Sequence, residues 1–134
     1  MVGVLGSVAW AQGPPVVTSQ GAELETGADA ALDEADGFGL AVVVSGFLSD
    51  NIWGVQVQNL KANQGYILNN NDGANPCTTG QIGPFTTGPA GAASASFMSA
   101  AGLEAEVHVC RSTDQVLTGT LGDVIQAVKG RRPF

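Results

Sequence analysis

The sequence has little of what catalysis or metal binding ordinarily needs. It holds one histidine, His108, and two cysteines among 134 residues. A single histidine cannot supply the several imidazole ligands of a copper–zinc site. No G-x-S-x-G sequence is present to carry a serine nucleophile. Basic residues are also scarce, with five against twelve acidic ones and a net charge of -7. This balance argues against binding nucleic acid or an anionic lipid surface, because both need basic patches.

Long apolar runs are missing as well. Residues 1–11 are uncharged and end in Ala-Trp-Ala, which resembles a signal-peptide cleavage site. We interpret them as a truncated signal-peptide remnant, with a first buried strand as the alternative. Gln12 and the following Gly-Pro-Pro end the run well short of the roughly 20 residues that span a membrane. We therefore expect a protein that is secreted, extracellular or in the cell envelope, with no membrane span in its mature chain.

The two cysteines, Cys77 and Cys110, are consistent with export, because exported proteins commonly link such a pair in a disulfide bond and cytosolic proteins rarely do. The chain lacks a C-x-x-C motif, and His108 is the only further soft metal ligand. We therefore expect one structural disulfide. Cys110 has the same strand parity as Glu106 and His108, on the face predicted to be wet. The bridge is thus expected on an outer face or a strand edge, unless a bulge changes the register after Val109.

The abundant residues are glycines, 19 in all, and they separate short apolar or alternating stretches. Residues 40–44 form a β-branched run that predicts a central strand covered on both faces. Such stretches at regular spacing predict an all-β fold, an antiparallel β-sandwich (immunoglobulin-like or Greek-key) of about seven or eight short strands with one disulfide. The immunoglobulin hallmark is missing, because Trp53 precedes Cys77 rather than lying between the cysteines.

The chain divides by composition into four segments. Residues 12–37 are an acidic leader that we expect to be partly ordered, with a strand near 22–24 or a helical turn at 28–32. Residues 38–130 are the predicted sandwich domain, in which 123–129 is helix or strand. Residues 131–134 form a basic tail that, with Lys129, could meet the acidic leader of another copy.

Two groups of side chains are weak candidates for chemistry. His108 and Glu106 are the best available acid–base pair, but we expect both on a solvated strand face. Asn69, Asn71 and Asp72 offer oxygen atoms on a tight turn, which makes calcium possible, although the spacing does not match an EF-hand. A plain hairpin loop is the alternative for that segment.

These observations lead to one functional expectation and two alternatives. We expect an exported or cell-surface structural or binding module with no catalytic site and no cofactor, which recognises an unknown extracellular partner through loops and strand edges. The alternatives are a self-assembling extracellular subunit and a calcium- or small-ligand-binding β-sandwich domain.

Overall fold

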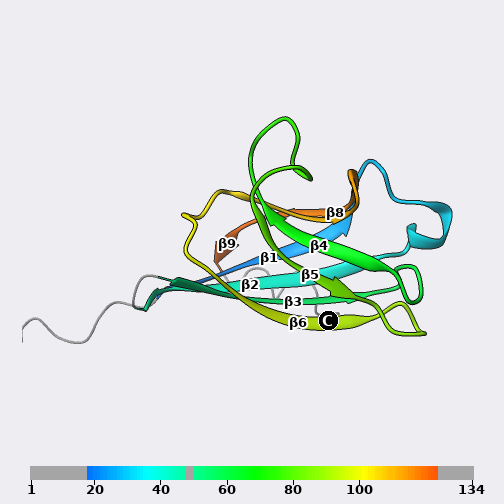
Figure 1. Ribbon diagram of the computed structural model, residues 1–134, viewed down its shortest axis with the longest axis horizontal. Helices are drawn as coiled ribbons and strands as arrows, with labels where there is room; N and C mark the ends of the chain where they lie inside the picture. Colours follow the sequence, from blue (N-terminus) through cyan, green and yellow to red (C-terminus); the bar gives the residue numbers. More distant parts are fainter. Residues whose placement is uncertain (1–17, 48–49, 124–134) are drawn as a thin grey trace, which may run out of the picture.

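The computed structural model describes residues 18–47 and 50–123 (Figure 1). Within these ranges nine strands form one sheet in the order β5-β4-β7-β8-β1-β2-β3-β6, with β9 beside β1. Every strand pairing is antiparallel. The elements are β1 (Thr18–Thr26), the 3-10 helix η1 (Leu32–Glu34), β2 (Phe38–Phe47), β3 (Asp50–Gln58), β4 (Gly65–Asn70), β5 (Gln81–Thr86), β6 (Ala93–Ser99), β7 (Glu106–Arg111), β8 (Asp114–Thr120) and β9 (Gly122–Asp123).

Strand β1 joins the two halves of the sheet. Most of its length pairs with β2, while its last two residues, Glu25 and Thr26, pair with β8. The sheet therefore bends at β1 and becomes nearly barrel-shaped, with β2, β3 and β6 on one side and β8, β7, β4 and β5 on the other (Figure 1). The predicted all-β antiparallel fold with one disulfide is confirmed. Its two layers are connected by hydrogen bonds through β1.

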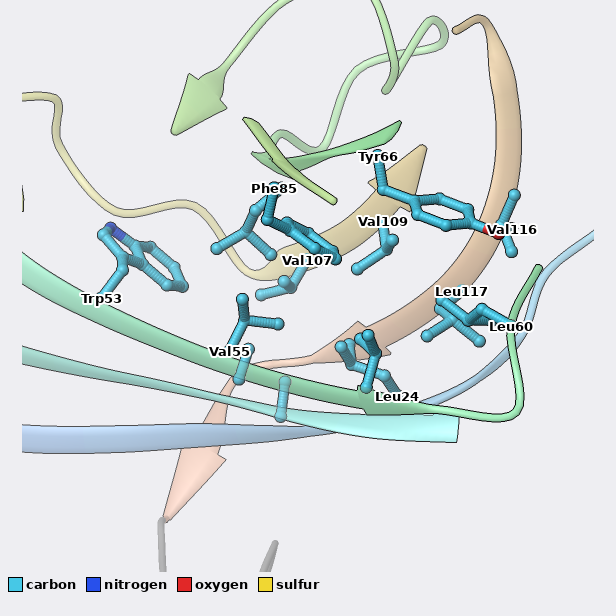
Figure 2. Packing of buried hydrophobic residues seen from close by; sticks show 14 of the residues in the cluster. Leu24, Trp53, Val55, Leu60, Tyr66, Phe85, Val107, Val109, Val116 and Leu117 are labelled. Carbon is cyan, nitrogen blue, oxygen red and sulfur yellow. The ribbon is translucent and has the colours of Figure 1, made fainter. Parts of the chain in front are cut away.

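The core fills the space between these two layers (Figure 2). Strand β3 shows how the sequence specifies it, since Trp53, Val55 and Val57 are buried while the residues between them face outward. This alternation follows from the two-residue repeat of a strand. Tyr66 and Phe85 meet these valines from the other layer, with their rings stacked 5.9 Å apart. Burying each such side chain contributes about 1.5–3 kcal/mol.

The acidic leader predicted at residues 12–37 contributes a central strand. Ala22 and Leu24 of β1 are fully buried, so a strand near residues 22–24 is present as predicted. The helical turn predicted at residues 28–32 lies instead at Leu32–Glu34, where Glu34 turns inward. Residues 18–37 are therefore part of the sheet and its connections, and the expected domain start at residue 38 falls inside the fold.

Several predictions concern residues outside the described ranges. The signal remnant at 1–11 and the basic tail at 131–134 lie there, as does most of the undecided segment 123–129. Within the described part of the chain, no helix is long and apolar enough to cross a membrane.

Candidate functional site

The loop at residues 71–80 covers the outer side of β4 and β7, and a disulfide holds it there. Cys77 and Cys110 are joined, with their Cα atoms 5.7 Å apart, and both are buried. The register of β7 against β8 does shift after Val109, but the extra residue is Val116 of β8. The alternation of β7 is therefore unbroken, and Cys110 lies on the face opposite the core residue Val109. The predicted outer-face bridge is present, on a face that the loop covers.

Asn70 fastens the start of this loop to the segment before β7. Its side-chain amide donates hydrogen bonds to the carbonyl oxygens of Glu104 and Glu106, at 2.8 and 2.7 Å. Its Oδ1 accepts a hydrogen bond from the backbone N–H of Glu104 at 2.8 Å. One buried side chain thus satisfies three backbone groups that would otherwise be costly to bury.

The predicted calcium candidates bind backbone groups of the loop and of the segment that leads into β7. Asp72 accepts hydrogen bonds from the N–H groups of Ala105 and Glu106, at 3.2 and 2.6 Å. Asn71 accepts one from Gly73, and Asn69 donates one to the carbonyl of Thr79. The three candidates therefore lie close together, but each is engaged in shaping the loop. No three His, Cys, Asp or Glu side chains gather into a metal-holding group in the described residues.

This arrangement predicts the outcome of Asp72→Ala. Two hydrogen bonds to an exposed charged group are lost, so we expect the free energy of unfolding to fall by about 1–2 kcal/mol. Urea denaturation with calcium and with a chelator should give the same difference. A stabilisation of the wild type by calcium that Asp72→Ala abolishes would favour the metal role instead.

His108 is buried, and its predicted position on a solvated face is wrong. The side chain is 2% exposed. The loop at residues 71–80 lies on this side of β7, since Cys77 is bonded to Cys110 and the Thr79 carbonyl accepts a hydrogen bond from Asn69, the cross-strand neighbour of His108. Its Nε2 lies 3.2 Å from a carboxylate oxygen of Glu106, and its Nδ1 lies 3.1 Å from the hydroxyl of Thr118. A carboxylate only accepts, so these contacts assign the proton of a neutral ring to Nε2. Both ring nitrogens are therefore engaged within the fold.

A buried ionic network was not predicted at all. The carboxylate of Glu34 is fully buried and receives two hydrogen bonds from Arg111, at 2.7 and 3.0 Å. The Tyr66 hydroxyl donates a third at 2.7 Å, and the N–H of Ala31 donates a fourth at 2.8 Å. Arg111 also binds Asp114 at 2.7 Å. This network ties η1 to β4 and β7.

The electrostatics of Glu34 follow from these partners. Burial alone raises its pKa, but hydrogen bonds from Arg111, Ala31 and Tyr66 outweigh burial and lower the pKa to about 2. The pKa of Tyr66 is raised by burial and by its hydrogen bond to the Glu34 carboxylate.

The only feature of the sequence that points to this network is the scarcity of cations. Lys61 and Arg111 are the only two among the described residues, and each has an acidic partner.

The outer face of β2, β3 and β6 is exposed, whereas the sequence predicted that the strand at residues 40–44 would be covered on both faces. The run at residues 40–44 is not covered on both faces. Ala41 and Val43 are buried, whereas Leu40, Val42 and Val44 are only half-buried on the outer side. The reason is that β2 lies in a layer whose outer surface has no covering element among the described residues.

This outer surface, here called the β2–β3–β6 face, contains a shallow depression of about 480 Å³. Gly54 forms its floor, because no atom approaches the space where a Cβ would lie. Beside it, Ile52 and its cross-strand partner Met98 are 42% and 65% exposed. The eight residues that define the face are all uncharged, namely Leu40, Val42, Ile52, Gly54, Gln56, Ser94, Ser96 and Met98.

Comparisons with known proteins add nothing to this geometry. No family model, no curated protein and no solved structure matches the chain.

Proposed function

We propose that this protein is an exported or cell-surface structural or binding module that acts through its β2–β3–β6 face. The observation that carries the proposal is an apolar, uncharged sheet face on a chain with a net charge of -7. Exposed apolar surface of this kind, rimmed by polar groups such as Gln56 and Ser94, is typical of a site where another molecule binds.

The chemistry of the face favours a neutral protein surface as the partner. Ile52 and Met98 supply apolar contact area, and Ser94, Ser96 and Gln56 supply hydrogen-bonding groups around it. The eight residues that define the face carry no charge and no aromatic ring; the nearest carboxylate by register is that of Glu23, opposite Leu40 on β1, and Phe38 lies two residues before Leu40 on β2.

The disulfide supports the export part of the proposal. Cys110 is fully buried, and the bridge anchors a loop that also covers His108. Bridges that form part of the packing in this way are common in exported proteins and rare in a reducing cytosol. Intact-mass measurement of the secreted chain, with and without reductant, would establish its start and its thiol state together.

A binding role fits the chain better than a catalytic one. The best acid–base candidate, His108, has both nitrogens engaged and is screened by the loop at residues 71–80. A general base must come within hydrogen-bond reach of its substrate. His108 could do so only after the disulfide-anchored loop had moved.

Site-specific photo-crosslinking would test the role of the face. A photoreactive residue is introduced at position 98, and the protein is produced in the cells that secrete it. Irradiation should then give a defined adduct. The same residue at position 86 should not, because Thr86 is also exposed but lies on β5 in the opposite layer. Adding Ile52→Lys should reduce the adduct at least tenfold, which corresponds to about 1.4 kcal/mol of binding energy. Equal labelling from both positions would contradict the proposal.

A further inference from the structure

The two end strands of the sheet are protected to different degrees. Strand β5 has an exposed proline, Pro84, in its middle, and its pairing with β4 shifts register after Leu68. Strand β6 pairs with β3 without any register shift over seven residues, and it contains neither proline nor a charged side chain. Natural sheets commonly blunt their free edges with proline, charge or bulges. Such a device is present on β5 and absent from β6.

Strand β5 lies against β6, but within the described residues no strand is hydrogen-bonded to the second backbone edge of β6. The hydrogen-bonded order of the described sheet stops at β5 on one side and at β6 on the other. Phe97 of β6 packs its ring against Gly83 of β5, and its cross-strand partner Trp53 is buried in the core. Strand β5 therefore meets β6 through a side chain on the core side, and not through backbone hydrogen bonds.

We propose that β6 pairs with β6 of a second copy of this chain, antiparallel and about a two-fold axis at Ser96. This inference goes beyond the proposed function, since it names a different contact, the strand edge, and a specific partner. In this register every position places a large residue opposite a small one or joins two small ones. Phe97 faces Ala95 on the core side, and Met98 faces Ser94 on the outer side.

The charge distribution makes β6 the strand where two copies repel each other least. Two chains that each carry -7 repel one another, and the least repulsion arises where no charge lies at the contact. Strand β6 is uncharged along its whole length, so the two backbones can approach to pairing distance. Pairing also covers part of Met98, which is 65% exposed in one copy. The β2–β3–β6 faces of both copies then form one continuous surface.

Sedimentation velocity of the full secreted chain, from micromolar to millimolar concentration, would test the pairing. The wild type should show a concentration-dependent dimer. Ser96→Lys should raise the dimer dissociation constant at least tenfold, because two like charges then lie opposite each other. Thr86→Lys, on the edge strand of the opposite layer, should dimerise as the wild type does. Both side chains are exposed, so both variants should keep the wild-type melting temperature.

A charge-swap mixture makes the test specific for a second copy. Ser96→Glu alone should be monomeric, and mixing it with Ser96→Lys should restore a dimer that contains one of each chain. Any of three results would overturn the proposal: a wild type that stays monomeric, a Ser96→Lys dimer as tight as the wild type, or a mixture that does not pair. In crosslinking from position 98, an adduct of twice the chain mass reports this dimer, whereas any other mass reports the partner of the β2–β3–β6 face.

Discussion

Replacing Glu34 by glutamine is expected to lower the free energy of unfolding by about 3–5 kcal/mol, the usual cost of removing one partner from a buried ion pair. The change leaves Arg111 without its fully buried carboxylate and removes a charge-assisted acceptor from Tyr66. Urea denaturation at neutral pH measures the loss.

The neighbouring residue Asp33 provides a matched control. It lies in the same 3-10 helix and pairs with Lys61 at 2.9 Å, but its side chain is 62% exposed. Exposed pairs contribute at most about 1 kcal/mol because solvent screens them. Asp33→Asn should therefore change the urea midpoint only slightly. Equal losses from the two substitutions would show that the Glu34 network is not a special feature of the fold.

The same carboxylate predicts how stability depends on pH. The pKa of Glu34 is about 2 in the folded chain, against an ordinary value of 4.5. A depressed folded pKa means that the ionised form stabilises the fold. This contribution, about 3 kcal/mol, is complete above pH 4.5 and is lost as the pH falls toward 2. Glu34→Gln should show a shallower loss of stability over this interval than the wild type, whereas parallel curves would contradict the assignment.

Removing the disulfide with the double substitution Cys77→Ala and Cys110→Ala should lower the free energy of unfolding by about 4 kcal/mol, given the size of the loop it closes. The two cysteines are 33 positions apart. The melting temperature should fall by roughly 10–20 °C for a chain of this size. Calorimetry of the double variant measures both quantities. A loss below about 1 kcal/mol would show that the remaining loop hydrogen bonds alone secure residues 71–80.

The loss of the bridge should also have a local signature at His108. The imidazole is covered by the loop that the bridge anchors, so it should react slowly with diethyl pyrocarbonate in the wild type. The double variant should react faster under conditions where it stays folded. The wild type treated with alkylating agent but no reductant serves as the control. Equal rates would mean that loop contacts other than Cys77–Cys110 shield the ring.

The β2–β3–β6 face and the β6 edge lie side by side, and together they define how the module would be used. The edge is proposed to join two copies, and the face to receive a different partner. Ser96 belongs to both features, whereas Val42 lies on the face and away from the edge. A substitution such as Val42→Lys should therefore impair partner binding and leave dimer formation intact.

The sequence by itself determined the local features of this fold. Val55 and Val57 alternate with Gln56 and Gln58, which separates a buried from an exposed side of this strand, because successive side chains of any strand point to opposite faces. A single pair of cysteines in a chain without a C-x-x-C motif predicted the Cys77–Cys110 bridge. The Asn- and Gly-rich stretch after β4 predicted a loop, since these residues tolerate turn conformations.

Only the tertiary structure decided what covers each strand. Parity placed His108 and Cys110 opposite the core correctly, but it could not show that residues 71–80 fold back over that face and bury both. In the same way, an apolar run at residues 40–44 does not say whether its second face meets another layer. Alternation distinguishes the two faces of a strand, and long-range contacts decide the surroundings of each.

The buried network is the clearest case of this limit. Glu34 is one of six acidic residues between positions 23 and 36, and nothing local separates it from its neighbours. Its partner Arg111 lies 77 residues away, brought near by the pairing of β7 with β4 and β8. Charge composition therefore predicted only an acidic, partly ordered leader, and the fold buries one of its carboxylates against Arg111. A pairing over that distance depends on the order of strands in the sheet, which no local pattern encodes.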